Sequence, residues 1–255
     1  MDVTVVGTGT ASLRLRRRQS CVVVETGAET LVFDLGFRAV RGMRRAGIHP
    51  SGVDLLFFTH FHADHTIDVI PFLFSRRFGA GGDAGTETPL RPFSMSGPEP
   101  FLRFWPSHSW DRRLLGAYQA EISELPRGHR GAMELPGCSL SWAPGDHRPE
   151  SIAYRLDSDR GSFVYTGDTG YTESVVRLAR GADTVLIDCT FPDERPFPGH
   201  LRPTGVARIA SEADVGRVIL THISPQAERL DLVSEVARGY EGEVIAAEDG
   251  LKLAV

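Results

Sequence analysis

One short stretch constrains this chain more than any other. His60, His62, Asp64 and His65 follow one another directly behind the apolar run LLFFT. His60 and His62 are two residues apart, so in an extended or turning segment both rings can face one point. Asp64 and His65 follow where a helix can begin. Burying so many titratable groups together without a cation would be costly. The spacing therefore predicts two adjacent metal half-sites, although a single histidine is more often a structural or surface residue.

Residues of the same kind stand at the ends of other apolar runs. His147, Asp168 and His222 each follow or end such a run. Together with the first stretch they offer nitrogen and carboxylate oxygen and no thiolate, a mixture that suits zinc and also accepts manganese or iron. We expect these side chains to meet at the ends of predicted strands.

Short apolar runs with turns between them predict strands in several parts of the chain. They cover residues 3–7, 21–26, 30–36, 53–60, 162–168, 184–190 and 217–222. Helical spacing appears over residues 39–46, 172–179, 204–213 and 230–238, with Thr204 as an expected helix N-cap and Gly181 as a stop. The alternation predicts an α+β protein with sheets inside and helices outside.

Size and charge limit the class of protein. A chain of 255 residues, 41% of them hydrophobic, can bury a sizeable core, so we expect one domain over 1–255, with an insertion around 75–113 that shapes substrate access. No apolar leader or membrane span is apparent and the three cysteines are widely spaced, which favours a cytoplasmic protein with reduced thiols. The net charge of −5 argues against a general nucleic-acid coat, but residues 13–18, LRLRRR, form a local basic patch.

The ordered motifs resemble the metallo-beta-lactamase superfamily over nearly the whole chain, and within it the ribonuclease Z-like branch. Besides H-x-H-x-D-H, the supporting pieces include LVFDLG, HRPESIAYRL, DTVLIDCTF and GHLRPT. The resemblance implies a four-layer αββα sandwich with the site at one edge of two sheets. It also implies one metal held by His60, His62 and His147, a second held by Asp64, His65 and His222, and Asp168 as the bridge. True beta-lactamases often carry cysteine at Asp168 and the di-iron branch carries glutamate at His62, so neither branch fits.

The same resemblance implies a mechanism. Two zinc ions would hold a metal-bridging hydroxide as the nucleophile. His200, in GHLRPT, matches a histidine that lies near the substrate, and Asp188 matches the carboxylate that fixes its tautomer. Asp64, His200 and Asp188 are therefore the candidate catalytic residues. The alternative for His200 is a surface histidine in a proline-rich loop.

Two departures from ribonuclease Z bear on the substrate. The long RNA-gripping arm of those enzymes would lie where only DSDRGS, starting at Asp157, joins two strands, and their His-Glu-Ala-Thr is replaced by Ile-Asp-Cys-Thr at residues 187–190. The leading hypothesis is thus a dinuclear-zinc phosphodiesterase acting on an anionic small molecule or cyclic nucleotide. The alternatives are a thioesterase or lactonase, a ribonuclease Z-type transfer-RNA 3′ endonuclease, and a metal-stabilised binding protein without catalysis. RNA is a less favoured partner, and a homodimer is expected by resemblance.

Overall fold

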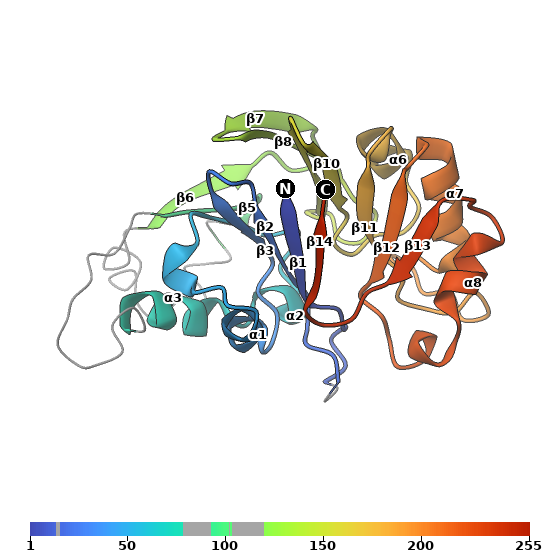
Figure 1. Cartoon of the computed structure of the whole chain (residues 1–255), viewed down its shortest axis with the longest axis horizontal. Coiled ribbons are helices and arrows are strands. Elements are labelled where there is room, and N and C mark those ends of the chain that lie inside the picture. The colour runs from blue at the N-terminus through green and yellow to red at the C-terminus, as the bar shows by residue number, and fades with distance from the viewer. Residues whose placement is uncertain (14–15, 79–92, 102, 104–119) are drawn as a thin grey trace.

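The computed structural model describes residues 1–13, 16–78, 93–101, 103 and 120–255. Its strands form two seven-stranded sheets that pack face to face, and helices cover the outer face of each sheet (Figure 1). The layer order is αββα, which confirms the predicted fold class. No helix in the described part of the chain is long and apolar enough to cross a membrane.

The first sheet is built mainly from the N-terminal half of the chain. In spatial order it contains β14 (Leu251–Ala254), β1 (Asp2–Gly7), β2 (Cys21–Glu25), β3 (Thr30–Phe33), β4 (Leu55–Phe57), β5 (Phe93–Pro98) and β6 (Ala120–Leu125). Its outer face packs against α1 (Ala39–Arg45) and α3 (Val69–Phe78), and the short helix α2 (Ala63–Thr66) lies between β4 and α3. A 3-10 turn, η1 (Pro50–Gly52), precedes β4.

The second sheet follows in the C-terminal half. Its spatial order is β13 (Glu243–Ala246), β12 (Arg217–Thr221), β11 (Thr184–Asp188), β10 (Gly161–Tyr165), β9 (Ile152–Ser158), β8 (Cys138–Pro144) and β7 (Gly131–Leu135). Its outer face is covered by α6 (Glu173–Ala179), α7 (Pro203–Ala213) and α8 (Leu232–Ala237) (Figure 1). A second 3-10 turn, η2 (Ala227–Arg229), lies between β12 and α8.

The two-residue period of a strand divides its side chains between two cores. In β2, Val22 and Val24 belong to the core between the sheets, whereas Val23 packs toward the helices of the first sheet. In β11, Leu186 points into the central core and its neighbours point toward α6 and α7. Such strands are buried on both faces, which explains why they read as continuous apolar runs.

All seven predicted apolar runs form strands, but other strands were missed. In β6 and β7 the side chains alternate between partly buried and exposed, so these strands have no continuous apolar signal. Gly181 has a left-handed φ of 63° just after α6, as a helix stop requires. The prediction that Thr204 caps α7 is wrong. The helix begins at Pro203 with Arg202 at the cap position, two residues before the predicted cap, and Thr204 donates its hydroxyl hydrogen to Asp193.

The ends of the predicted insertion belong to regular structure. Residues 75–78 complete α3, and residues 93–98 form β5 between β4 and β6. Phe101 is buried and packs against Phe58 and Phe61. The remainder of the interval, residues 79–92, 102 and 104–113, lies outside the described residues.

The topology brings several strand ends to one edge of the sandwich. Strands β3 to β6 are parallel, as are β10 to β13, so the carboxyl ends of each group lie at one edge of its sheet. Backbone hydrogen bonds join the two edges: Ile152 N donates to Thr59 O at 3.0 Å, and Ile223 N donates to Thr8 O at 2.9 Å. Six of the seven candidate ligands follow these ends, and His147 follows β8, which runs in the same direction as β10 because both are antiparallel to β9.

Candidate metal centre and active site

The motif behind β4 divides into an extended part and a helical part. The chain stays extended through His62 (φ −61°, ψ 149°), and α2 begins at the next residue. The His62 carbonyl accepts hydrogen bonds from the His65 amide and the Thr66 hydroxyl, both at 3.0 Å. His60 and His62 therefore leave the strand before the helix starts, while Asp64 and His65 lie in its first turn.

All seven predicted ligands come together in the structure. Candidate ligand atoms of His60, His62, His147 and Asp168 lie within 4.8 Å of one another, as do those of Asp64, His65 and His222. We call His60, His62 and His147 the first half-site and Asp64, His65 and His222 the second half-site. The second half-site is buried, whereas the first half-site is exposed to solvent at His62.

Asp168 lies between the half-sites with one oxygen facing each. Its Oδ2 lies 3.8 Å from His60 Nε2 and 3.7 Å from His147 Nε2. Its Oδ1 lies 3.2 Å from His65 Nε2 and 3.4 Å from His222 Nε2. A carboxylate in this position can contact two adjacent cations at the same time.

Hydrogen bonds on the first sheet orient two of the histidines. Asp34, which is fully buried, accepts hydrogen bonds from His65 Nδ1 at 2.7 Å, the Tyr165 hydroxyl at 2.9 Å and the Thr59 hydroxyl at 2.9 Å. Since that threonine donates its only hydrogen to Asp34, its oxygen accepts from His60 Nδ1 at 3.1 Å. In the neutral rings of His60 and His65, Nε2 then carries a free lone pair toward the cluster.

The second sheet orients its histidines in the same way. His147 Nδ1 donates to the Gly199 carbonyl at 2.9 Å, and a Cβ on Gly199, whose φ is 79°, would lie 2.8 Å from that nitrogen. Thr190 donates its hydroxyl hydrogen to Asp188 at 2.5 Å and therefore accepts from His222 Nδ1 at 2.8 Å. Both rings turn Nε2 inward. Partners of this kind on the far nitrogen are typical of metal-ligating histidines.

Burial and neighbouring charge act differently on the titratable groups. Burial lowers the pKa of each histidine in the first half-site. Burial also opposes a charge on His65, but the carboxylates of Asp168 and Asp34 outweigh it and raise the pKa of His65. Burial likewise opposes ionisation of Asp168, yet the charges of His222 and His65 hold its pKa well below the ordinary value. A negative potential at the centre of the cluster favours either a proton or a metal cation.

The donor set fits metal ions. His65 Nε2 and Asp168 Oδ1 are buried and have no hydrogen-bond partner. His62 Nδ1 lies 3.1 Å from His60 Nε2 and 3.0 Å from His147 Nε2. Three ring nitrogens therefore meet, and each belongs to a histidine whose pKa is lowered. A proton on His62 Nδ1 can satisfy only one of these two contacts, whereas a cation between the nitrogens would satisfy all three lone pairs. The cluster therefore suits divalent metal ions of the kind that nitrogen and carboxylate ligands bind.

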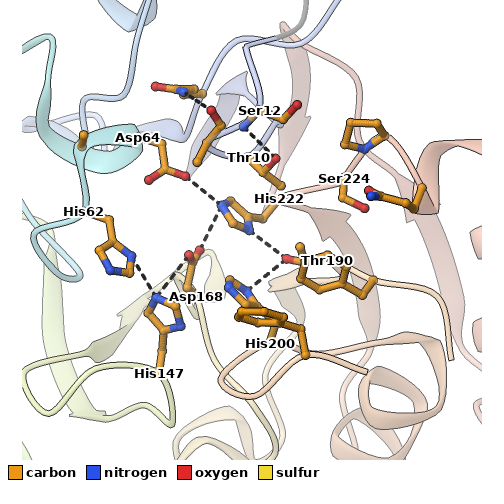
Figure 2. Close-up of a pocket in the computed structure, with 17 residues that line it drawn as sticks. Thr10, Ser12, His62, Asp64, His147, Asp168, Thr190, His200, His222 and Ser224 are labelled. Carbon is orange, nitrogen blue, oxygen red and sulfur yellow. Dashed lines mark hydrogen bonds and ion pairs between the residues drawn. The ribbon is translucent and has the colours of Figure 1, made fainter. Parts of the chain in front are cut away.

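The two other predicted residues adjoin the cluster. His200 Nδ1 donates to Asp188 Oδ2 at 2.8 Å, and the His200 ring stacks on His222 at 5.4 Å (Figure 2). Burial lowers the pKa of His200, but its hydrogen bond to Asp188 outweighs this and raises that pKa. Asp188 is fully buried, and His200 lines the pocket in front of the cluster. The alternative of a free surface histidine is wrong, and Nε2 remains available to a bound molecule.

The pocket in front of the cluster has a volume of about 640 Å³. Its lining combines His62, His147, Asp168, His200 and His222 with neutral polar and aromatic side chains. Thr10 and Ser12 contribute from the loop after β1, and Ser224 contributes from the segment after β12 (Figure 2). A cavity of this size accommodates a molecule of about nucleotide size.

The described arginines of residues 13–18 do not form one basic patch. Arg17 hydrogen-bonds Thr8, the Ala247 carbonyl and Glu228, and Arg18 binds the Val6 carbonyl and pairs with Asp249. These two arginines attach the loop after β1 to the C-terminal part of the chain because they are folded against it. Neither lines the pocket. Arg16 is exposed, and residues 14 and 15 lie outside the described part.

Sequence reasoning missed two supporting residues and left one aspartate without a role. Asp34 lies near the end of the predicted strand over residues 30–36, a position that carried a signal because other polar residues at strand ends were chosen as ligands. Thr190 also ends a predicted strand, but threonine is not among the metal-ligating residue types considered, and its role is seen only once its neighbours are known. Asp68 has a structural role: its Oδ2 accepts from the Val40 amide at 3.0 Å and so caps α1 from outside the helix.

Comparison with known proteins identifies the family of the chain. A model of the Beta-lactamase superfamily domain matches residues 29–223. An uncharacterized protein of Mycobacterium leprae is 32% identical over 86% of this chain and 76% of its own length. A protein of Haloarcula marismortui named Ribonuclease Z is 28% identical over 99% of this chain and 96% of its own length.

Solved structures show the same fold. The metallo-beta-lactamase fold protein YhfI from Bacillus subtilis has a TM-score of 0.85 at 20% identity, covering 99% of this chain and 98% of that chain. A diphosphatase from the PhnP family has a TM-score of 0.71 at 24% identity, covering 99% of this chain and 97% of that chain. At these identities the likeness establishes the arrangement of sheets and helices and leaves the substrate open.

Proposed function

Because the chain belongs to the beta-lactamase superfamily, as its motifs predicted, and is a metal-dependent hydrolase of that fold, we propose that it cleaves small phosphodiesters with two zinc ions. The observation that carries the proposal is Asp168, whose two oxygens face different pairs of histidines. One carboxylate shared by two half-sites supports a pair of ions more directly than a single one. Manganese or iron would suit the same ligands.

The proposed ligand sets follow the geometry. The first half-site, His60, His62 and His147, would hold one ion, the second half-site, Asp64, His65 and His222, would hold the other, and Asp168 would contact both. When bound, such ions supply Lewis acidity, which lowers the pKa of water and offsets negative charge on a substrate oxygen. Asp34, Gly199 and Thr190 accept hydrogen bonds from the outer ring nitrogens of His65, His147 and His222, so in the neutral rings the lone pair lies on the inward nitrogen and faces the cluster.

His200 is the proposed proton donor. Its Nδ1 is held by Asp188, so a proton on Nε2 can pass to the oxygen of the departing group. The raised pKa of His200 keeps this proton available toward neutral pH. Asp188 would act as a positioning residue, since it is buried behind the histidine and also accepts hydrogen bonds from Thr190 and the Thr169 amide.

Two observations support a small phosphodiester over RNA or a carbonyl compound. The names Ribonuclease Z and diphosphatase both denote cleavage at phosphorus. Between β9 and β10 the chain makes a tight turn at Asp159 and Arg160, so no arm that could grip RNA extends from this described connection. We also propose a single domain over 1–255, because the C-terminal strand β14 pairs with β1.

The test uses the full chain loaded with zinc or manganese. Metal content is measured by elemental analysis, and hydrolysis of bis(4-nitrophenyl) phosphate is compared with hydrolysis of a thioester, a lactone and a precursor transfer RNA. We expect about two metal ions per chain and cleavage of the diester. Inert behaviour on the diester with rapid thioester or lactone hydrolysis would contradict the phosphodiesterase proposal and keep the hydrolase class. Cleavage of the RNA at a defined 3′ position would favour an RNA-processing role instead.

A further inference from the structure

Two phenylalanines form one wall of the pocket beside His200. The rings of Phe191 and Phe197 have centroids 5.4 Å apart and an interplanar angle of 33°. Their centroids lie 5.6 Å and 6.0 Å from that of His200. Phe197 is 58% exposed and lines the pocket, so its apolar ring is accessible to a molecule bound there. We call Phe191 and Phe197 the aromatic platform.

The loop that carries the platform is fixed at several points. The amides of Thr190 and Phe191 both donate to the Leu201 carbonyl, at 3.1 Å and 3.4 Å, which closes the base of the loop. The His200 amide donates to the Phe197 carbonyl at 3.3 Å. Prolines at 192, 196 and 198 further restrict the backbone. A ring on such a loop loses little conformational freedom when it binds a ligand.

The charge of the lining limits what else the molecule can carry. Within the described part of the chain, the pocket is lined by no lysine or arginine. Arg148 is exposed and its charge acts on His62, but it does not line the pocket. One phosphodiester charge can be met at the metal centre and His200. Further phosphate groups would find no cationic side chain in this lining.

Neutral hydrogen-bonding groups lie close to the platform. The Ser224 amide donates to the Thr190 carbonyl at 3.3 Å, which brings the segment after β12 beside the start of the platform loop (Figure 2). The side chains of Ser224 and Gln226 line the pocket there, and those of Ser12 and Gln19 line it from the loop after β1. A stacking surface with neutral donors and acceptors around it matches a nucleobase, which has a flat face and polar edges.

We propose that Phe191 and Phe197 bind the nucleobase of the substrate by stacking, and that the natural substrate is a phosphodiester with one phosphate group and one such base in the pocket. This inference rests on the proposed function and deepens it. It names Phe197 as the specificity-determining residue, because its ring is the more exposed part of the platform. The metal centre and His200 would act on the phosphate, and the platform would select what is attached to it.

The experiment compares two diesters with the same leaving group. One is thymidine 5′-(4-nitrophenyl phosphate), and the other is the corresponding deoxyribose ester without the base. For the zinc-loaded protein we expect kcat/KM to favour the base-bearing diester by about tenfold. Phe197→Leu, which keeps an apolar side chain and loses the ring, should bring the ratio to within about twofold of one, whereas Phe197→Trp should keep it. Phe74→Leu is the matched control, since Phe74 is 40% exposed on α3 and lies outside the pocket lining.

A binding measurement separates the platform from catalysis. Isothermal titration calorimetry with thymidine 5′-monophosphate and deoxyribose 5-phosphate should give the same preference and the same loss in Phe197→Leu. The platform would be overturned if the wild-type protein hydrolysed the two diesters with nearly equal kcat/KM. It would also be overturned if neither Phe197→Leu nor Phe74→Leu changed the ratio of the two kcat/KM values. In both cases hydrolysis of the diesters would still support the proposed function. If neither diester is hydrolysed, the proposed function fails, and the calorimetric preference alone then decides the platform.

Discussion

The two sheets contribute to the metal centre in different ways. The first sheet supplies four candidate ligands from one stretch of six residues behind β4. The second sheet supplies His147, Asp168 and His222, which follow three different strands, β8, β10 and β12. The first set is held together by chain connectivity, whereas the second is held together only by strand pairing and by loops that pack across the edge. Because the ligands of the first sheet are already close along the chain, assembly of the whole site depends on how the second sheet and its loops fold.

The supporting hydrogen bonds follow the same division. On the first sheet one buried carboxylate, Asp34, supports His65 directly and His60 through Thr59. On the second sheet each histidine has its own support, the Gly199 carbonyl for His147 and Thr190 for His222. Both supports flank the loop that also carries His200, so this loop connects metal binding with proton transfer. The following changes test this comparison.

The largest effect is expected for Asp168→Ala. The substitution removes the only oxygens that face both half-sites in the described structure, so each half-site would lose a shared ligand and no carboxylate would lie between the two sets of histidines. We expect metal content to fall and the rate of diester hydrolysis to drop by more than about 100-fold. Loss of a residue that only supports a metal ligand already costs up to about 100-fold, and Asp168 is a proposed ligand. Elemental analysis and hydrolysis rates provide the measurement. Asp159→Ala, an exposed aspartate in the β9–β10 turn, is the control, and full metal content in the Asp168 variant would contradict the bridging role.

His200→Gln should separate proton transfer from metal binding. We expect unchanged metal content and a loss of turnover of about 100-fold or more. Because the pKa of His200 is raised, its acid form persists above the ordinary histidine range, and the rate should fall only as pH rises through that elevated pKa. Asp188→Asn removes the first group that raises this pKa and should move the falling limb to lower pH. A pH profile that is the same in all three proteins would refute the proton-donor assignment.

The supports of the two sheets can be compared by Asp34→Asn and Thr190→Val. Asp34→Asn weakens the hold on two histidines, whereas Thr190→Val removes one support of His222 and one hydrogen bond to Asp188. Loss of such partners typically costs about 10- to 100-fold in metal affinity. We expect the larger loss for Asp34→Asn, measured by competition with a zinc chelator. Equal metal affinity in both variants and the wild type would show that these bonds do not orient the ligands.

The smallest effect is expected for Asp68→Ala. This aspartate belongs to the same stretch as the ligands but binds the Val40 amide at the start of α1. Its removal should lower the free energy of unfolding by about 1 kcal/mol, as for loss of a helix cap, without changing metal content. Chemical denaturation of the metal-loaded protein measures the change. A loss of metal would show that the Asp68 contact also supports the cluster.

Much of the fold could be predicted because its central strands are buried on both faces. Continuous apolar runs such as residues 162–168, 184–190 and 217–222 predict such strands. Strands β10, β11 and β12 overlap these three ranges. Strands β6 and β7 left no comparable signal, since their side chains alternate between partly buried and exposed positions. The cap at Thr204 was misplaced because that threonine binds Asp193 across a loop, a contact that local preference does not contain.

The sequence by itself determined the chemistry of the centre. Seven residues with nitrogen and oxygen donors, four of them in one motif, already specified a site for divalent metal ions, because few other arrangements allow so many titratable groups to lie together. Only the tertiary structure decided how those donors are oriented, since the partners of each ring come from distant segments such as Asp34, Thr190 and Gly199. It also decided that Arg17 and Arg18 attach a loop and do not line the pocket, and that Phe197 does line it. Orientation and exposure depend on which segments pack together, and spacing along the chain does not fix that.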